Sequence, residues 1–141
     1  KAINHYLGLF VNINRSNINE KYRQLEDYMS SSFQSRFHSE MNDFIETVKN
    51  EDLTEYLTDT KIQPVYDGNG NVKVTILAKI NGTLKGEQLE PKEEVITLGL
   101  KVILPSDLNN WGLQIQEIVR SSAESYKSIS NLKQRKVEAK Q

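Results

Sequence analysis

The apolar residues of this chain repeat with two different periods, and this change of period limits the folds that it can adopt. Over residues 1–57 they recur every three or four positions, for example at Phe33, Phe37 and Met41. Over residues 58–120 they alternate with polar residues, as in "VKVTILAKI". The first spacing predicts amphipathic helices, and the second predicts strands with one buried face. A block of helices followed by a block of strands predicts an α+β domain.

Turn-forming residues divide the second block into strands and indicate where the sheet bends. The stretches "DGNGN" and "PSDLNN" predict hairpin loops between consecutive strands. Gly99, Gly112 and Pro64 interrupt the strand pattern, which predicts bends or bulges. We therefore expect N-terminal helices packed on a curved, four-stranded antiparallel sheet.

The length of 141 residues fits one domain with one hydrophobic core. We expect this domain to extend over residues 1–130, with its helical part at 1–57 and its sheet at 58–120. Residues 121–141 have weak helical spacing and are mostly polar, so we expect a terminal helix that frays into a tail.

Composition and charge exclude several classes of function. The formal net charge is -1, so no overall field attracts the chain to nucleic acid, and we expect no direct nucleic-acid binding. The chain has no cysteine, which excludes disulfides, thiolate chemistry and cysteine metal sites. It has no apolar run of roughly 18 residues that could span a membrane. It begins with Lys1 rather than Met, and we expect a further segment upstream.

The residue types that carry chemistry form no catalytic or metal-binding pattern. His5 and His38 have no acidic or histidine partner at metal-ligand spacing, so we expect no metal and no cofactor. Most carboxylates lie on the predicted polar faces of helices. Asp59 is the acidic residue best placed to face the mouth of a cone-shaped sheet. An enzyme would need it to act with an inward-facing partner such as Tyr56 or Tyr66.

The only tryptophan lies in the stretch "SDLNNWGLQIQEIV", where Trp111 begins the last predicted strand. Trp111 is expected either to cap the core or to make an oligomer contact, and a small-molecule site beside it is the alternative. On the first helix, Tyr6, Leu7 and Phe10 are apolar and could contact a partner. These four residues are the interface candidates.

The stretch "NNWGLQIQEI" resembles the last strand of the bitopic scaffold protein of type IV secretion and conjugation channels. The match rests on Asn109, Gly112, Leu113 and Ile115, together with the order of helices and strands. Asn110 stands where that family usually has a proline. The resemblance implies the cone-shaped nuclear-transport-factor-2-like or cystatin-like fold, a single membrane helix upstream, and an extracytoplasmic location at the cell membrane. It also implies self-association, contacts with other channel proteins, and no catalytic residues.

The leading hypothesis is thus a non-enzymatic scaffold module of a conjugative type IV secretion channel. The many lysines and asparagines favour a Gram-positive plasmid source. The alternatives are a cone-fold enzyme, such as an isomerase or dehydratase, and a small-ligand or peptide-binding module of a surface protein.

Overall fold

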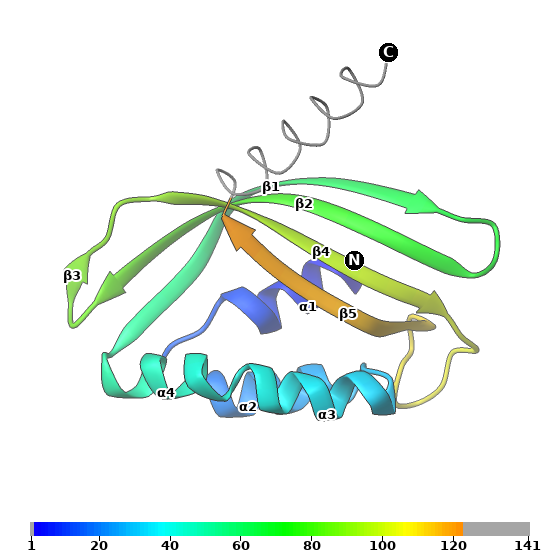
Figure 1. Cartoon of the computed structure of the whole chain (residues 1–141), viewed down its shortest axis with the longest axis horizontal. Coiled ribbons are helices and arrows are strands. Elements are labelled where there is room, and N and C mark those ends of the chain that lie inside the picture. The colour runs from blue at the N-terminus through cyan, green and yellow to red at the C-terminus, as the bar shows by residue number, and fades with distance from the viewer. Residues whose placement is uncertain (1, 123–141) are drawn as a thin grey trace, which may run out of the picture.

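The computed structural model describes residues 2–122, which form a layer of helices under one curved antiparallel sheet (Figure 1). The helices are α1 (Ala2–Val11), α2 (Ile18–Glu26), α3 (Ser31–Glu40) and α4 (Asn42–Asn50). The strands are β1 (Leu53–Tyr66), β2 (Asn71–Leu84), β3 (Glu87–Gln88), β4 (Lys92–Val102) and β5 (Leu113–Ser122). The predicted α+β class, with helices packed on a curved antiparallel sheet, is confirmed. No helix in the described residues is long and apolar enough to cross a membrane.

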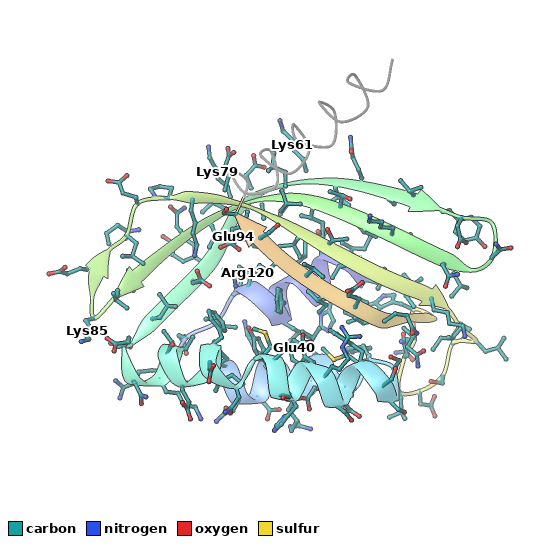
Figure 2. All side chains as sticks on the ribbon, viewed as in Figure 1. Glu40, Lys61, Lys79, Lys85, Glu94 and Arg120 are labelled. Atoms are coloured by element: carbon teal, nitrogen blue, oxygen red, sulfur yellow. The ribbon has the colours of Figure 1, made fainter. Side chains whose placement is uncertain are left out.

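The sheet has the strand order β1-β2-β4-β5, with the short β3 paired to the end of β2. The alternation in β2 sets its two faces: Val74, Ile76, Ala78 and Ile80 are buried against the helices. The polar residues of the same strand lie on the opposite, convex face, where Lys79 points away from the helices (Figure 2). The concave face therefore supplies one wall of the core.

Helix α1 lies between the sheet and the layer formed by α2, α3 and α4 (Figure 1). It is apolar on most of its surface, as expected for a helix that packs on both sides. Each of its large buried side chains contributes about 1.5–3 kcal/mol through removal from water. Helix α3 begins at the N-cap Ser30, whose Oγ accepts a hydrogen bond from the Phe33 amide at 3.3 Å.

Two boundaries differ from those predicted from the sequence. The helical spacing that includes Phe33, Phe37 and Met41 does not continue as one helix. The chain divides at Met41 into two helices, so α3 packs against β5 while α4 packs against β1. The helical part ends at Asn50 rather than at residue 57. Asp52 has a left-handed backbone, with φ of 50°, which stops the helix and starts β1 at Leu53.

The last strand is also displaced from its predicted position. β5 begins at Leu113, so Trp111 lies in the preceding loop instead of starting the strand. β5 continues to Ser122, two residues beyond the predicted end of the sheet. The helix and tail expected over residues 121–141 therefore give way to strand at 121–122, and the remainder lies outside the described residues.

Candidate functional site

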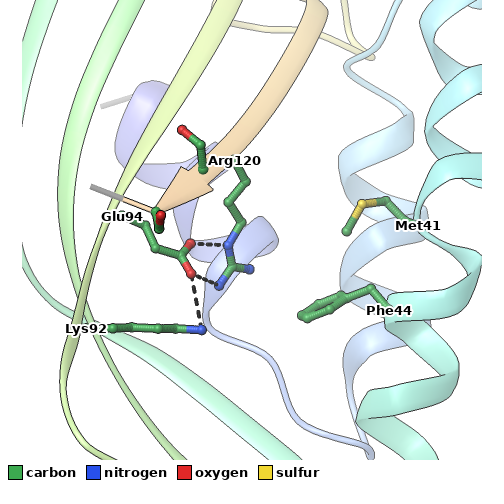
Figure 3. Close-up of a pocket in the computed structure, with 7 residues that line it drawn as sticks. Met41, Phe44, Lys92, Glu94 and Arg120 are labelled. Atoms are coloured by element: carbon green, nitrogen blue, oxygen red, sulfur yellow. Dashed lines mark hydrogen bonds and ion pairs between the residues drawn. The ribbon is translucent and has the colours of Figure 1, made fainter. Parts of the chain in front are cut away.

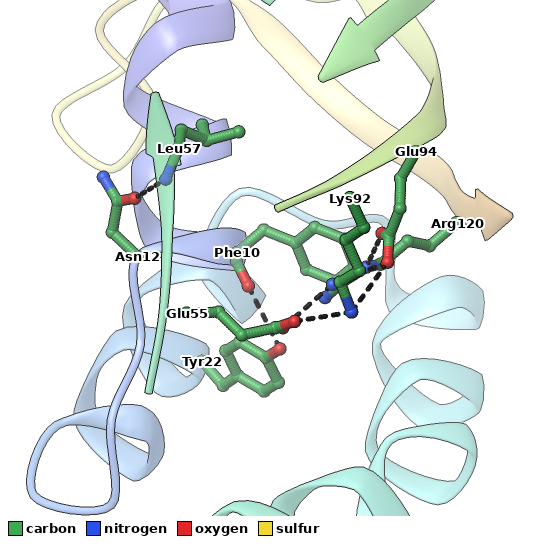
Figure 4. Close-up of polar contacts among 8 residues, drawn as sticks. All are labelled: Phe10, Asn12, Tyr22, Glu55, Leu57, Lys92, Glu94 and Arg120. Atoms are coloured by element: carbon green, nitrogen blue, oxygen red, sulfur yellow. Dashed lines mark hydrogen bonds and ion pairs between the residues drawn. The ribbon is translucent and has the colours of Figure 1, made fainter. Parts of the chain in front are cut away.

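Four charged side chains converge on the concave face of the sheet, and we call Glu55, Lys92, Glu94 and Arg120 the interior charge network (Figure 4). They come from β1, β4 and β5. Their convergence follows from the strand register, because Lys92 and Glu94 lie opposite Ile80 and Ala78, and Arg120 lies opposite Ile96. Ile80, Ala78 and Ile96 all face the helices, so the charged residues opposite them face the helices too.

Arg120 is the centre of this network. Its Nη2 donates to Glu55 at 2.8 Å and to Glu94 at 3.2 Å, and its Nε also donates to Glu94. Lys92 Nζ lies 2.8 Å from the Glu55 carboxylate and 3.1 Å from that of Glu94. Two carboxylates and two cations thus neutralise each other inside the fold.

The environment of the network is strongly desolvated. The Glu55 side chain is only 2% exposed, whereas Lys92 is 51% exposed and reaches solvent. The Arg120 guanidinium lies over the rings of Phe10 and Phe44, at 5.9 and 5.5 Å from their centroids. Removing charges from water costs several kcal/mol per ion, so such a cluster persists only because each charge is paired.

Burial by itself would raise the pKa of Glu94, but the hydrogen bonds and charge of Arg120, with help from Lys92, hold that pKa below its usual value. Burial would lower the pKa of Arg120, and its two carboxylate partners instead raise it. A general acid at neutral pH needs a raised carboxyl pKa. The shift at Glu94 has the opposite sign, so Glu94 stays ionised at neutral pH and does not meet this requirement.

A pocket of about 280 Å³ opens beside the network, lined by Met41, Phe44, Lys92, Glu94, Arg120, Ser121 and Ser122 (Figure 3). The Nη1 of Arg120 is buried and has no hydrogen-bond partner among the described residues. Trp111 is not among the lining residues, so this pocket is not the aromatic site considered from the sequence.

The structure separates the residues proposed for an enzyme. Asp59 lies opposite Lys79, whose side chain points to the convex face, so its carboxylate is turned away from the interior. Tyr66 is exposed near the far end of β1, seven residues away, or roughly 20 Å along an extended strand. The inward-facing Asp59 that the enzyme alternative would need, with Tyr56 or Tyr66 as its partner, is therefore not found.

The two histidines have separate surroundings. His38 Nδ1 lies 3.3 Å from the Glu26 carboxylate at the surface, and His5 packs against aromatic rings. The described residues contain no group of three or more His, Cys, Asp or Glu side chains that could hold a metal ion.

A second cluster surrounds Trp111 and consists of His5, Tyr6, Tyr28 and Trp111, which we call the aromatic cluster. The ring centroids of His5 and Trp111 are 4.8 Å apart, and those of Tyr6 and Tyr28 are 5.0 Å apart. Trp111 is 40% exposed, whereas Tyr6 is 1% exposed. The cluster thus reaches from the core to the surface.

The carbonyl of Leu113, at the start of β5, holds this cluster in place. The Tyr6 hydroxyl donates to the Leu113 carbonyl at 2.7 Å, and Asn109 Nδ2 donates to the same oxygen at 2.8 Å. Burial raises the pKa of Tyr6 to about 12, although Asn109 acts in the opposite direction. Gly112 has φ of +65°, and a Cβ there would lie 2.7 Å from the Ile103 carbonyl oxygen. The glycine is therefore required by the loop.

The interface candidates divide into two groups. Tyr6, Leu7 and Phe10 are buried in the core of this chain, which corrects the expectation that they present an apolar surface to a partner. Their helix is covered on both sides, a feature that spacing on one helix could not reveal. Only Trp111 among the four is exposed.

Sequence reasoning missed the interior charge network. A signal was present, because Arg120 follows Ile118 by two residues and Glu94 precedes Ile96 by two, which places both in the buried phase of their strands. The partner Glu55 could not have been found in this way, since residues 51–57 were assigned to the helical part.

No protein-family model matches the chain, and no curated protein sequence matches it. Several solved structures, however, superpose on it. CagV, a VirB8 homologue of the type IV secretion system of Helicobacter pylori strain 26695, superposes with a TM-score of 0.63 at 16% identity, covering 84% of this chain and 92% of that one. VirB8 of Agrobacterium tumefaciens superposes with a TM-score of 0.61 at 11% identity, covering 85% and 87%.

The fold is that of VirB8-type secretion proteins. A periplasmic fragment of TraM has the same VirB8-like arrangement, with a TM-score of 0.56, 13% identity and coverage of 84% and 90%. The nuclear-transport-factor-2-like fold expected from the sequence is thereby confirmed. At these identities the VirB8-like resemblance is one of fold.

Proposed function

We propose that this chain is a non-enzymatic scaffold module of a type IV secretion channel. The observation that carries the proposal is the extent of the fold match, since 84% of this chain superposes on 92% of CagV. The match therefore extends over most of both chains and is not confined to one motif.

The interior supports a structural role. Its charged groups form ion pairs with one another, and the lowered pKa of Glu94 does not suit general acid catalysis. A fixed interior leaves the surface as the place where this domain acts.

Trp111 is the surface residue that we assign to contacts with other channel proteins or with another copy. It is half-exposed and held in place by three neighbouring rings, so little side-chain entropy is lost when it is covered. Aromatic side chains of this kind are enriched among the residues that dominate binding energy. The ring of the buried Tyr6 packs against Trp111 from the core side, so we assign Tyr6 the role of positioning Trp111.

The finer assignment is a conjugative channel of Gram-positive plasmid type, in which a membrane helix upstream anchors this domain on the extracytoplasmic side of the cell membrane. The similarity to a periplasmic fragment of TraM supports the extracytoplasmic location, and the many lysines and asparagines support the Gram-positive source. The net charge of -1 favours protein partners over direct contact with the transferred DNA.

Deletion of the gene in its host, followed by complementation, tests the proposal. We expect deletion to abolish transfer of the mobile element and the wild-type gene to restore it. Trp111→Ala should restore transfer poorly, whereas Leu104→Ala, which alters a residue 89% exposed in the same loop, should restore it fully. Protease added outside the membrane should cleave the domain. Normal transfer from the deletion strain would refute the assignment.

A further inference from the structure

The hairpin between β1 and β2 carries an asparagine followed by a glycine at its tip, Asn69 and Gly70. An asparagine loses its side-chain amide when the backbone nitrogen of the next residue attacks the amide carbon. Glycine favours this attack because it has no Cβ to obstruct the approach. The same dipeptide occurs once more, as Asn81 and Gly82 inside β2, so one chain presents it in two different settings.

At the hairpin, the peptide group between Asn69 and Gly70 is not held in place. The Asp67 carboxylate accepts hydrogen bonds from the Asn69 amide at 2.7 Å, from the Asn71 amide at 3.2 Å and from Asn71 Nδ2 at 3.1 Å. The Gly70 amide is left out of this set and has no hydrogen-bond partner among residues 2–122. The carbonyl and the exposed side chain of Asn69 likewise bond to no residue that the structure describes. The nitrogen and the carbon that must meet can therefore approach each other.

The second dipeptide is held by its strand. Asn81 is the register partner of Tyr56, and Gly82 is the register partner of Glu55. The Gly82 carbonyl also accepts a hydrogen bond from the Leu89 amide at 2.9 Å. Ring closure at Asn81 would turn this peptide group out of the sheet, so the strand has to open locally first.

Asp67 also precedes a glycine, Gly68, but its carboxylate does not suit the same reaction. The hydrogen bond from the Asn69 amide, together with those from Asn71, holds the pKa of Asp67 below its usual value. The group therefore stays ionised, and an ionised carboxylate resists attack by an amide nitrogen. The reactive side chain of this hairpin is thus Asn69.

We propose that Asn69 is a site of spontaneous deamidation in the folded protein. The Gly70 nitrogen bonds to Asn69 Cγ, the Cγ–Nδ2 bond breaks, and the proton from the Gly70 nitrogen leaves with the amide group as ammonia. Water then opens the cyclic imide at one of its two carbonyls and gives aspartate or isoaspartate. Water is the only co-reactant, and no oxidation or reduction takes place. The site does not depend on the proposed role in secretion.

The product alters the hairpin in two ways. It adds a negative charge beside Asp67, in a groove region of about 480 Å³ whose lining includes Asp67 and Asn71. Isoaspartate also adds one carbon to the backbone just before Gly70, whose carbonyl accepts a hydrogen bond from the Val102 amide at 2.7 Å. Deamidation therefore changes both the charge of the hairpin and its attachment to β4.

Peptide mass mapping of the purified full chain, aged in mildly alkaline buffer, tests the proposal. Deamidation raises the mass of the affected peptide by about 1 Da. In the folded protein Asn69 should convert at least about tenfold faster than Asn81, because Asn81 must wait for the strand to open. In guanidinium chloride the two should convert at similar rates. Equal rates in the folded protein, or an Asn69 that reacts only in the unfolded chain, would overturn the proposal.

Asn69→Gln is the matched variant, because its longer side chain would have to close a six-membered ring, which forms far more slowly. Isoelectric focusing of the aged wild type should show an acidic form that is missing from Asn69→Gln of the same age. Asn81→Gln should leave that form unchanged, and melting curves check that both variants fold. An acidic form that persists in Asn69→Gln, or that disappears in Asn81→Gln, would contradict the assignment.

Discussion

The guanidinium of Arg120 and the carboxylate of Glu55 lie 2.8 Å apart, although 65 residues separate them in the chain. They belong to β5 and β1, the two outer strands of the sheet. The contact therefore crosses the concave face from one edge of the sheet to the other. This contact holds the two edges of the curved sheet together around the core helices.

Arg120→Ala should destabilise the domain by about 3–5 kcal/mol, because two buried carboxylates lose their main partner. Urea denaturation measures the free energy of unfolding. Arg23→Ala removes the exposed pair with Glu20 and should change this energy little. Similar losses for the two variants would show that the interior charge network does not support the fold.

Stability should fall in acid partly through Glu94. The pKa of Glu94 in the folded protein lies below the usual value. Glu94 therefore stabilises the fold at pH values above the ordinary pKa of a glutamate. That contribution is lost as the pH falls through the lowered pKa of the folded state. The difference in unfolding free energy between wild type and Glu94→Gln should therefore be largest near neutral pH and shrink in acid. A difference that stays constant from neutral pH into acid would contradict the shift.

Tyr6→Phe should cost about 0.5–1.5 kcal/mol, since the hydroxyl that donates to the Leu113 carbonyl is removed while the ring remains. Tyr28→Phe is the control, because the Tyr28 ring lies in the same aromatic cluster and none of its contacts shown by the structure is a hydroxyl hydrogen bond. Thermal melting of both variants gives the comparison. Equal melting temperatures would mean that the hydrogen bond to Leu113 contributes nothing.

Gly112→Ala should be more damaging than Gly86→Ala. Both glycines have positive φ, so alanine adds about 1 kcal/mol of backbone strain at either position. At Gly112 the new methyl group would also press on the Ile103 carbonyl, whereas nothing lies within 4 Å at Gly86. Chemical denaturation should show the larger loss for Gly112→Ala, and Trp111 fluorescence should report a displaced loop. A smaller loss at Gly112 would argue against the tight loop.

Periodicity was sufficient to predict the class of fold because it reflects burial directly. The alternation around Ile76 places one face of β2 against the core, as found. The spacing of Phe33 and Phe37 likewise predicts a buried helical face. What periodicity could not give was the break at Met41, because the two helices on either side of it pack on different strands, β5 and β1, that follow later in the chain.

The candidate sites show the same limit. Trp111 was identified because it is the only tryptophan, and its exposure fits an interface. Tyr6 was misjudged because an apolar face does not reveal whether it contacts the core or a partner. The interior charge network depends on strand register between distant segments, so Glu55 has no local signal that points to Arg120.

Because Arg120 lies two residues before Ser122, tension applied to the chain at the end of β5 would reach the interior charge network almost at once. β5 is hydrogen-bonded along its length to β4, so a pull along the strand must shear many bonds together instead of opening them one by one. The ion pair to Glu55 would transfer part of that load to the opposite edge of the sheet. Under such a pull, the β4–β5 hydrogen bonds and this ion pair would therefore resist separation of the strands together.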